Sequence, residues 1–188
     1  SDVCSSDLAM ILCTGNPNHL TIASAVAKKF PSAEFASRAT GYDLTFASEG
    51  SETHFRNKIR NYNIFINSSL IRNGRQLALL EVTYEEWSKN NIAGHIINIG
   101  SISEHMGTIN IMPMNLYWAL YSVHKRALRD RSLQLNTKSN IKTSHITAGG
   151  INDGKPGREQ WLGVDVIADT IDRKSTRLNS SHIPLSRM

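Results

Sequence analysis

Short apolar runs alternate with longer segments of helical periodicity along this chain. The runs Met10-Ile-Leu-Cys13 and Asn63-Ile-Phe-Ile66 are typical of buried parallel strands. Between 20 and 30, apolar residues recur every three or four positions, as in an amphipathic helix. The same reasoning predicts further strands at 33–37, 95–99 and 144–147, and helices at 48–60, 75–89, 116–135 and 164–171. This alternation predicts an α/β fold with a doubly wound parallel sheet between two layers of helices.

Two end segments differ from the rest of the chain. Residues 1–8 and 173–188 have no usable periodicity and resemble translated sequencing-adapter DNA. We therefore expect them to be non-native, and residues 9–172 to form a single domain. The formal net charge is +5, but four basic residues lie in the second segment and two acidic ones in the first. The remaining surplus is small, and it does not favour a nucleic-acid partner.

Cysteine content and hydropathy favour a cytoplasmic protein. The chain has two cysteines, too few for a disulfide framework, and Cys13 lies in an apolar run as a core residue would. No apolar stretch approaches the roughly 20 residues that span a bilayer, and no secretory leader is visible. With 188 residues, 40% of them hydrophobic, the chain can bury a core as one unit. We expect no membrane partner.

Tyr121 and Lys125 are the first candidates for chemistry. On the expected helix 116–135 they lie one turn apart on the same face, with roughly 5–6 Å between their Cβ atoms. A nearby ammonium favours the phenolate, so we expect the pKa of Tyr121 to lie below its ordinary value of about 10. Such a tyrosine could exchange a proton with an alcohol or carbonyl oxygen. The alternative is a solvated pair on a helix surface.

Several motifs in a fixed order resemble those of the short-chain dehydrogenase/reductase family across nearly all of 9–172. The segment Thr14-Gly-Asn-Pro-Asn-His-Leu-Thr-Ile-Ala23 keeps one glycine, and is similar to the phosphate-loop variant of enoyl-acyl-carrier-protein reductases. The other matches are the adenine-contacting motif, the NNAG position, the strand that delivers a catalytic serine, the YxxxK pair and the P-G position. In the same order, the matching segments are Tyr42-Asp-Leu-Thr45, Asn67-Ser-Ser-Leu70, Ile97-Asn-Ile-Gly-Ser101, Tyr121 with Lys125, and Ala148-Gly149.

The resemblance implies a Rossmann fold and an oxidoreductase that interconverts a small-molecule carbonyl and an alcohol by hydride transfer. Ser101 would hydrogen-bond the substrate oxygen, and Tyr121 would act as its general acid/base. Lys125 would lower the pKa of Tyr121 and hold the nicotinamide ribose. Asn73 is the nearest match to the family's asparagine, which helps to hold a proton-relay water; alternatively it caps the following helix.

The resemblance also implies bound NADP or NAD and no metal. Arg38 follows the second strand and suits a 2′-phosphate, which favours NADP; the alternative is an exposed loop cation. The other residues expected to border the cofactor follow the strands or belong to the matched motifs. They are Thr14, Gly15, Asn16, Thr21, Ile22, Ser37, Asp43, Leu44, Asn67, Ser68, Ser69, Gly149 and Ile151, together with Tyr121 and Lys125.

Departures from the family pattern leave alternatives open. Twenty positions separate Ser101 from Tyr121, more than is usual, so Thr108 competes with Ser101 and Tyr117 with Tyr121. The family's last strand would follow Ile171, where the adapter-like segment begins, so we expect that strand to be missing. Family members commonly form homodimers or homotetramers. The second functional hypothesis is a non-catalytic dinucleotide-binding protein that senses the cofactor or a partner.

Overall fold

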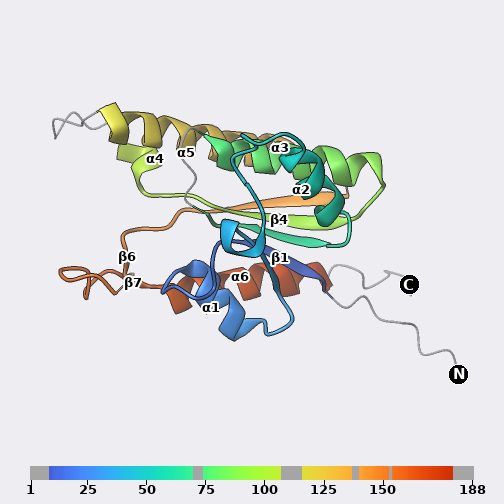
Figure 1. The fold of residues 1–188 in the computed structure, drawn as a ribbon. Helices are drawn as coiled ribbons and strands as arrows, with labels where there is room; N and C mark the ends of the chain where they lie inside the picture. Colours follow the sequence, from blue (N-terminus) through green and yellow to red (C-terminus); the bar gives the residue numbers. More distant parts are fainter. Residues whose placement is uncertain (1–8, 70–73, 107–115, 137–139, 153, 180–188) are drawn as a thin grey trace, which may run out of the picture.

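Five parallel strands form the centre of the molecule (Figure 1). The structure is a computed structural model that describes residues 9–69, 74–106, 116–136, 140–152 and 154–179. The strand order is β2-β1-β3-β4-β5, and every neighbouring pair is parallel. The strands are β1 (Ile11–Thr14), β2 (Glu34–Ala36), β3 (Ile64–Asn67), β4 (Gly94–Ile99) and β5 (Ile141–Ile146).

Successive strand residues alternate between the two faces of the sheet. Leu12, Phe65 and Ile96 pack into one apolar cluster, and their neighbours Cys13 and Ile66 pack into another. The helices of the first face are α2 (Ser51–Ile59), α3 (Arg75–Lys89) and α5 (Leu116–Leu135). Those of the second face are α1 (Ile22–Lys29) and α6 (Val164–Asn179), which lie below the sheet in Figure 1.

This three-layer α/β/α arrangement confirms the predicted fold class. From β1 the chain crosses to β2 on one side, and β3 then pairs with the other edge of β1. The gap between the carboxyl ends of β1 and β3 is therefore the topological switch point, where open α/β sheets bind ligands. Smaller elements border this end: the 3₁₀ helix η1 (Arg38–Thr40), α4 (Ser103–Met106), and the short strands β6 (Ile151–Asn152) and β7 (Leu162–Gly163).

Several element boundaries differ from the sequence prediction, among them those of β5 and α6. The strand expected at 144–147 is β5, which begins earlier, at Ile141. The helix expected to end at 171 continues to Asn179, into the segment 173–188 that shows no usable periodicity in the sequence. Ile167, Ile171 and Ser175 are all buried and four residues apart, so one face of α6 stays against the sheet beyond residue 172. Within the described ranges no strand follows α6.

None of the helices in the described part of the chain is both long enough and apolar enough to span a membrane.

Candidate active site

A cavity of about 1190 Å³ lies at the carboxyl ends of the strands, at the switch point. Its volume is above the roughly 300–1,000 Å³ of an ordinary small-molecule site. The predicted site residues that line it come from the ends of β1, β3 and β4, from α1 and α5, and from the segment after β5. They are Thr14, Gly15, Asn16, Thr21, Ile22, Ser68, Ser69, Ser101, Tyr121, Gly149 and Ile151.

The turn after β1 depends on Gly15. This residue has φ +129°, a region that side-chain-bearing residues rarely adopt, and a Cβ there would lie 2.9 Å from the Cβ of Ala23. Its N–H donates to the carbonyl of Ala36 at 3.0 Å, which joins the turn to the end of β2. Thr14 fixes the other side, because its Oγ1 accepts from the N–H groups of Ser68 (2.9 Å) and Ser69 (3.0 Å). The turn is thus held between the ends of β2 and β3.

Replacing Gly15 with alanine is expected to lower the free energy of unfolding by about 1–3 kcal/mol, the usual cost of forcing a residue into a rare backbone conformation. The matched control is Gly149→Ala, because Gly149 lines the same cavity and an added Cβ there meets nothing within 4 Å. Urea denaturation of the two variants measures the difference. If the two variants had equal free energies of unfolding, the prediction would be wrong, because the Cβ at position 15 would then be accommodated beside Ala23 without strain.

Tyr121 and Ser101 face the same cavity from α5 and from the end of β4. The Tyr121 ring is partly buried and makes an edge contact with Trp118, with 5.6 Å between ring centroids. Ser101 hydrogen-bonds to Tyr121, and its Oγ also accepts from the N–H of Ser103 at 3.3 Å, at the start of α4. A phenol and a hydroxyl are therefore placed side by side at the cavity wall, where both can reach one ligand oxygen.

Burial raises the pKa of Tyr121 above its ordinary value. The hydrogen bond from Ser101 opposes this effect, whereas the nearby Tyr117 and Glu104 add to it. The sequence prediction of a lowered pKa is therefore wrong for this structure, because desolvation of the phenol outweighs the favourable interactions. Tyr121 remains a protonated phenol at neutral pH, and this is the form that donates a proton.

Lys125 is 7% exposed and is not among the described residues that line the cavity. Its Nζ donates to Oε1 of Gln76 at 2.6 Å and to the carbonyl of Ile99 at 2.9 Å, and it lies 5.6 Å from the centre of the Tyr121 ring. Burial lowers the pKa of Lys125 to about 8, and the charge of Glu104 opposes that shift. The ammonium is held near the phenol. It is charged at neutral pH and loses its charge when the pH rises through about 8.

Gln76, in the first turn of α3, is a site residue that the sequence prediction missed. It is buried, and its Nε2 donates to the carbonyls of Asn67 (2.6 Å) and Ile99 (3.0 Å) while its Oε1 accepts from Lys125. The predicted Asn73 lies outside the described residues, as does Thr108. One indication of Gln76 was present in the sequence: it is a polar residue two positions after Gly74, at the start of a predicted helix.

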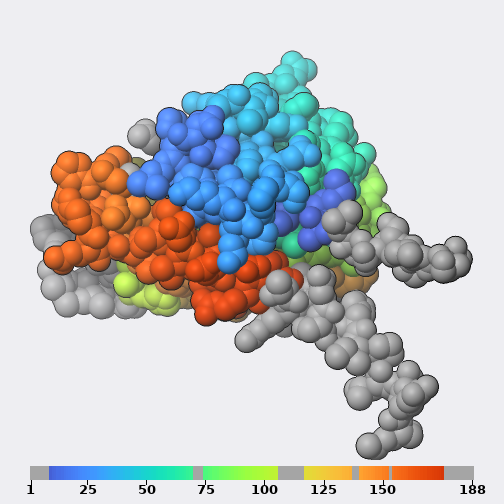
Figure 2. All heavy atoms as spheres, turned by 90° about the horizontal axis from the view of Figure 1, so that it is seen from below, coloured from blue at the N-terminus to red at the C-terminus, as the bar shows by residue number. Residues whose placement is uncertain are grey.

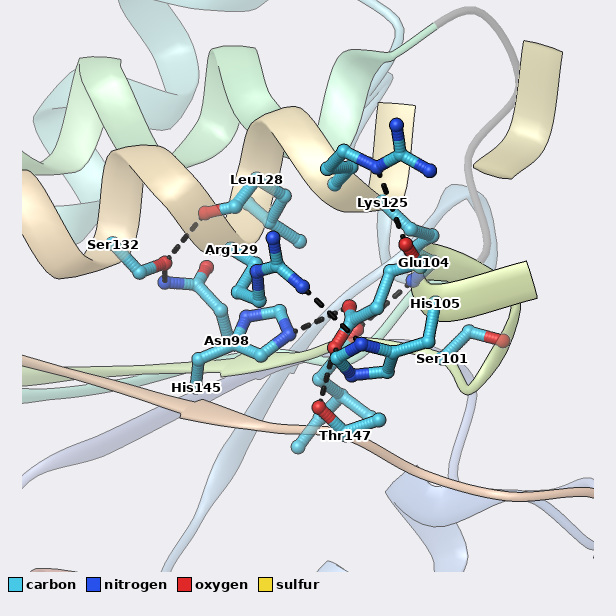
Figure 3. A network of polar contacts seen from close by, with 12 residues as sticks. Asn98, Ser101, Glu104, His105, Lys125, Leu128, Arg129, Ser132, His145 and Thr147 are labelled. Atoms are coloured by element: carbon cyan, nitrogen blue, oxygen red, sulfur yellow. Dashed lines mark hydrogen bonds and ion pairs between the residues drawn. The ribbon is translucent and has the colours of Figure 1, made fainter. Parts of the chain in front are cut away.

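A second polar cluster lies behind Ser101 (Figure 3). The buried carboxylate of Glu104 accepts from Nε2 of His145 at 2.9 Å and from the hydroxyl of Thr147. Burial lowers the pKa of His145, although the hydrogen bond and charge of Glu104 oppose that shift. A Cβ on Gly100 would lie only 2.1 Å from Nε2 of His145, so the backbone before Ser101 rests directly on this pair. The cluster fixes the position of the Ser101 backbone.

Other predicted site residues lie outside the cavity wall. Asn67 is buried and its Nδ2 donates to Asn98 and to the carbonyl of Gln76, both at 2.8 Å. Leu44 is part of the core. The carboxylate of Asp43 accepts hydrogen bonds from the backbone and hydroxyl groups of Thr45 and Ser48, which hold its pKa well below the ordinary range.

Ser37 and Arg38 lie at the end of β2. Ser37 is the N-cap residue of η1, its N–H donates to Oγ1 of Thr40 at 2.8 Å, and Arg38 is exposed. Arg38 is two residues from Ala36, whose carbonyl is bonded to Gly15, so it lies near the turn after β1. Tyr117, the alternative to Tyr121, is 47% exposed and is not among the described residues that line the cavity.

Further cavity residues were not predicted from the sequence. Ser103 and Ser122 also line the cavity, but their hydroxyl oxygens are buried and have no hydrogen-bond partner among the described residues. Lys155, Arg158 and Trp161 line it from the loop between β6 and β7. The volume of the cavity, the glycine turn that leaves room for close backbone approach, and the two cations fit an anionic ligand of dinucleotide size.

The fold is similar to those of solved dehydrogenase structures. One is 4-hydroxyisoleucine dehydrogenase in complex with NADH, at 17% identity and TM-score 0.65 over 88% of this chain and 90% of that one. A second is a bulky-bulky ketone specific alcohol dehydrogenase from Comamonas testosteroni, at 15% identity and TM-score 0.62 over 97% and 98%. A third is a short-chain dehydrogenase from Burkholderia cenocepacia J2315 in complex with NADP, at 11% identity and TM-score 0.59 over 86% and 81%.

No protein-family model matches the sequence, and no curated protein matches it. At 11–17% identity the similarity to solved structures is one of fold. The class that the comparisons define is therefore the Rossmann-type α/β fold found in dehydrogenases.

Proposed function

We propose that this chain is an NAD(P)(H)-dependent oxidoreductase that interconverts a carbonyl and an alcohol. The observation that carries the proposal is the placement of Tyr121 and Ser101 on one wall of the switch-point cavity, with the buried ammonium of Lys125 below them. The fold shared with NADH- and NADP-bound dehydrogenases supports the same proposal.

The turn after β1, with Gly15 and the start of α1, would hold the diphosphate of the cofactor. Ser68 and Ser69 at the end of β3, with Gly149 and Ile151 beyond β5, would border the nicotinamide half. When bound, the nicotinamide supplies the hydride or accepts it.

The residues of the chain supply the proton and the position. In the reducing direction Tyr121 would donate its phenolic proton to the carbonyl oxygen. Ser101 donates a hydrogen bond to the same oxygen and stabilises the charge that develops there. Lys125 would donate to ribose hydroxyls of the cofactor and stabilise the phenolate that Tyr121 becomes. In the oxidising direction that phenolate accepts the proton of the alcohol.

Nicotinamide fluorescence and turnover over a panel of carbonyl compounds test this function. The proposal expects the fluorescence of NADPH or NADH to change on mixing with the protein, and absorbance at the nicotinamide band to fall with at least one carbonyl compound. If the protein binds neither NADPH nor NADH, the proposed function is contradicted. Binding without turnover on any compound would instead support a non-catalytic cofactor sensor.

We further propose that the cofactor is NADP(H) rather than NAD(H), because Arg38 is exposed at the end of β2 near the turn after β1. Arg38→Ala is expected to raise the Kd of NADPH by roughly 10–100-fold, since a hydrogen bond to a charged group contributes about 1.5–3 kcal/mol. The Kd of NADH, which has no 2′-phosphate, should stay unchanged. Fluorescence titration with both cofactors measures this, and Lys28→Ala, at an exposed cation of α1, is the control. An equal change for both cofactors would contradict the assignment.

A further inference from the structure

The loop 154–161 between β6 and β7 lies over the turn that follows β1. The pairing of Ile151 with Leu162 closes the base of the loop, and Ile151 packs against Ala25 of α1 and Val164 of α6. Further out, a Cβ on Gly154 would lie 2.9 Å from Cδ2 of Leu20, just before α1. In Figure 2 the surface of the loop region, in orange, adjoins the blue surface of the turn and α1. The base of the loop thus packs against α1, and Gly154 lies close to Leu20 in the turn.

The charged side chains of the loop that reach the cavity are both cations. Among the described residues that line it, Lys155 and Arg158 carry charge, and no carboxylate does. The guanidinium of Arg158 lies 4.9 Å from the centre of the Trp161 ring, a cation–π contact that limits its freedom. Glu159 is turned back within the loop, where its Oε1 accepts from the N–H of Gly157 at 3.0 Å. This side of the cavity therefore favours an anion.

The turn itself offers few donors to an anion. Only Gly15 remains of the glycines that let a diphosphate approach the backbone, and Thr21 and Ala23 bring side chains to the start of α1. The N–H of Thr21 already donates to Oγ of Ser24 at 3.1 Å, and those of Ser24 and Ala25 donate to the carbonyl of Thr21. A second source of positive charge beside the turn would therefore strengthen the binding of a diphosphate.

We propose that Lys155 and Arg158 bind the cofactor diphosphate from above the turn, and so replace contacts that a glycine-rich loop would make with its backbone. This inference rests on the proposed function. The same pair of cations would also suit a carboxylate or phosphate on the substrate, so the test separates the two sources of anion.

The test is ligand binding by the full chain and its Lys155→Ala/Arg158→Ala variant. The probes are ADP-ribose, which contains the diphosphate, and nicotinamide riboside, which contains no phosphate. The double substitution is expected to raise the Kd of ADP-ribose about tenfold or more, as charge-assisted bonds are lost, and to flatten its dependence on salt. Nicotinamide riboside should bind with unchanged affinity. Lys28→Ala is the control, and Lys155→Arg should retain the affinity of the original chain.

The possible failures are distinguishable. If the unmodified chain binds ADP-ribose and the double variant binds it equally well, the inference is wrong while the proposed function stands. A raised KM for acidic carbonyl substrates, with the Kd of ADP-ribose unchanged, would assign the cations to the substrate and overturn the inference. If the unmodified chain binds neither ADP-ribose nor NADPH, the proposed function and the inference fail together. Circular dichroism of each variant confirms that the fold is retained.

Discussion

Tyr121→Phe is expected to lower kcat for carbonyl reduction by about 10²–10⁴-fold, the usual contribution of general acid/base catalysis. The phenylalanine ring keeps the packing against Trp118, so only the proton donor is lost. The Kd of NADPH should therefore remain unchanged. Steady-state kinetics with the best substrate of the carbonyl panel measure the first effect, and fluorescence titration measures the second.

Tyr117→Phe is the matched control for Tyr121→Phe. Tyr117 is on the same helix, one turn earlier, and is exposed outside the cavity wall. Its substitution should leave kcat within the error of the measurement. A large loss of kcat in Tyr117→Phe together with a small one in Tyr121→Phe would transfer the acid/base role to Tyr117.

The sequence was sufficient to predict the layers of the fold. The helices predicted at 75–89 and 116–135 have the bounds of α3 and α5, because long amphipathic segments carry a strong periodic signal. The sequence could not predict that α6 continues beyond residue 172. One buried serine, Ser175, continues the inward face, and a small polar residue carries no hydrophobic signal.

The site was only partly predictable because spacing gives proximity but not solvation. A spacing of four residues on a helix predicts that Tyr121 and Lys125 are neighbours. The sign of the pKa shift of Tyr121, however, depends on how deeply the phenol is buried. The partner of Lys125 is set by the way α3 packs on the ends of β3 and β4, which brings in Gln76. Lys155 and Arg158 gave no signal, because a short polar loop has no period that shows where it folds.

We expect the buried ammonium of Lys125 to make activity depend on pH slightly above neutral. Because burial lowers the pKa of Lys125 to about 8, the charged form is present below that pH and is lost as the pH rises through it. Tyr121, with its raised pKa, stays protonated across this range. We therefore expect the affinity for NADPH, and kcat/KM for reduction, to fall as the pH rises through about 8. Lys125→Met should lower kcat/KM by roughly 10²-fold and remove this alkaline limb, since two charge-assisted bonds at about 1.5 kcal/mol each are lost.

If Gln76 positions Lys125, substitution of Gln76 should shift the same alkaline limb of the pH profile. Gln76→Leu removes the acceptor 2.6 Å from the ammonium, which leaves the Ile99 carbonyl and makes the charged form less stable. The limb should move to lower pH, whereas a residue that only stabilises the fold would change the melting temperature and leave the limb in place. Gln76→Met repeats the test with a different side-chain shape. Persistence of the alkaline limb in Lys125→Met would show that another group titrates there, and an unshifted limb in both Gln76 variants would reduce Gln76 to a packing role.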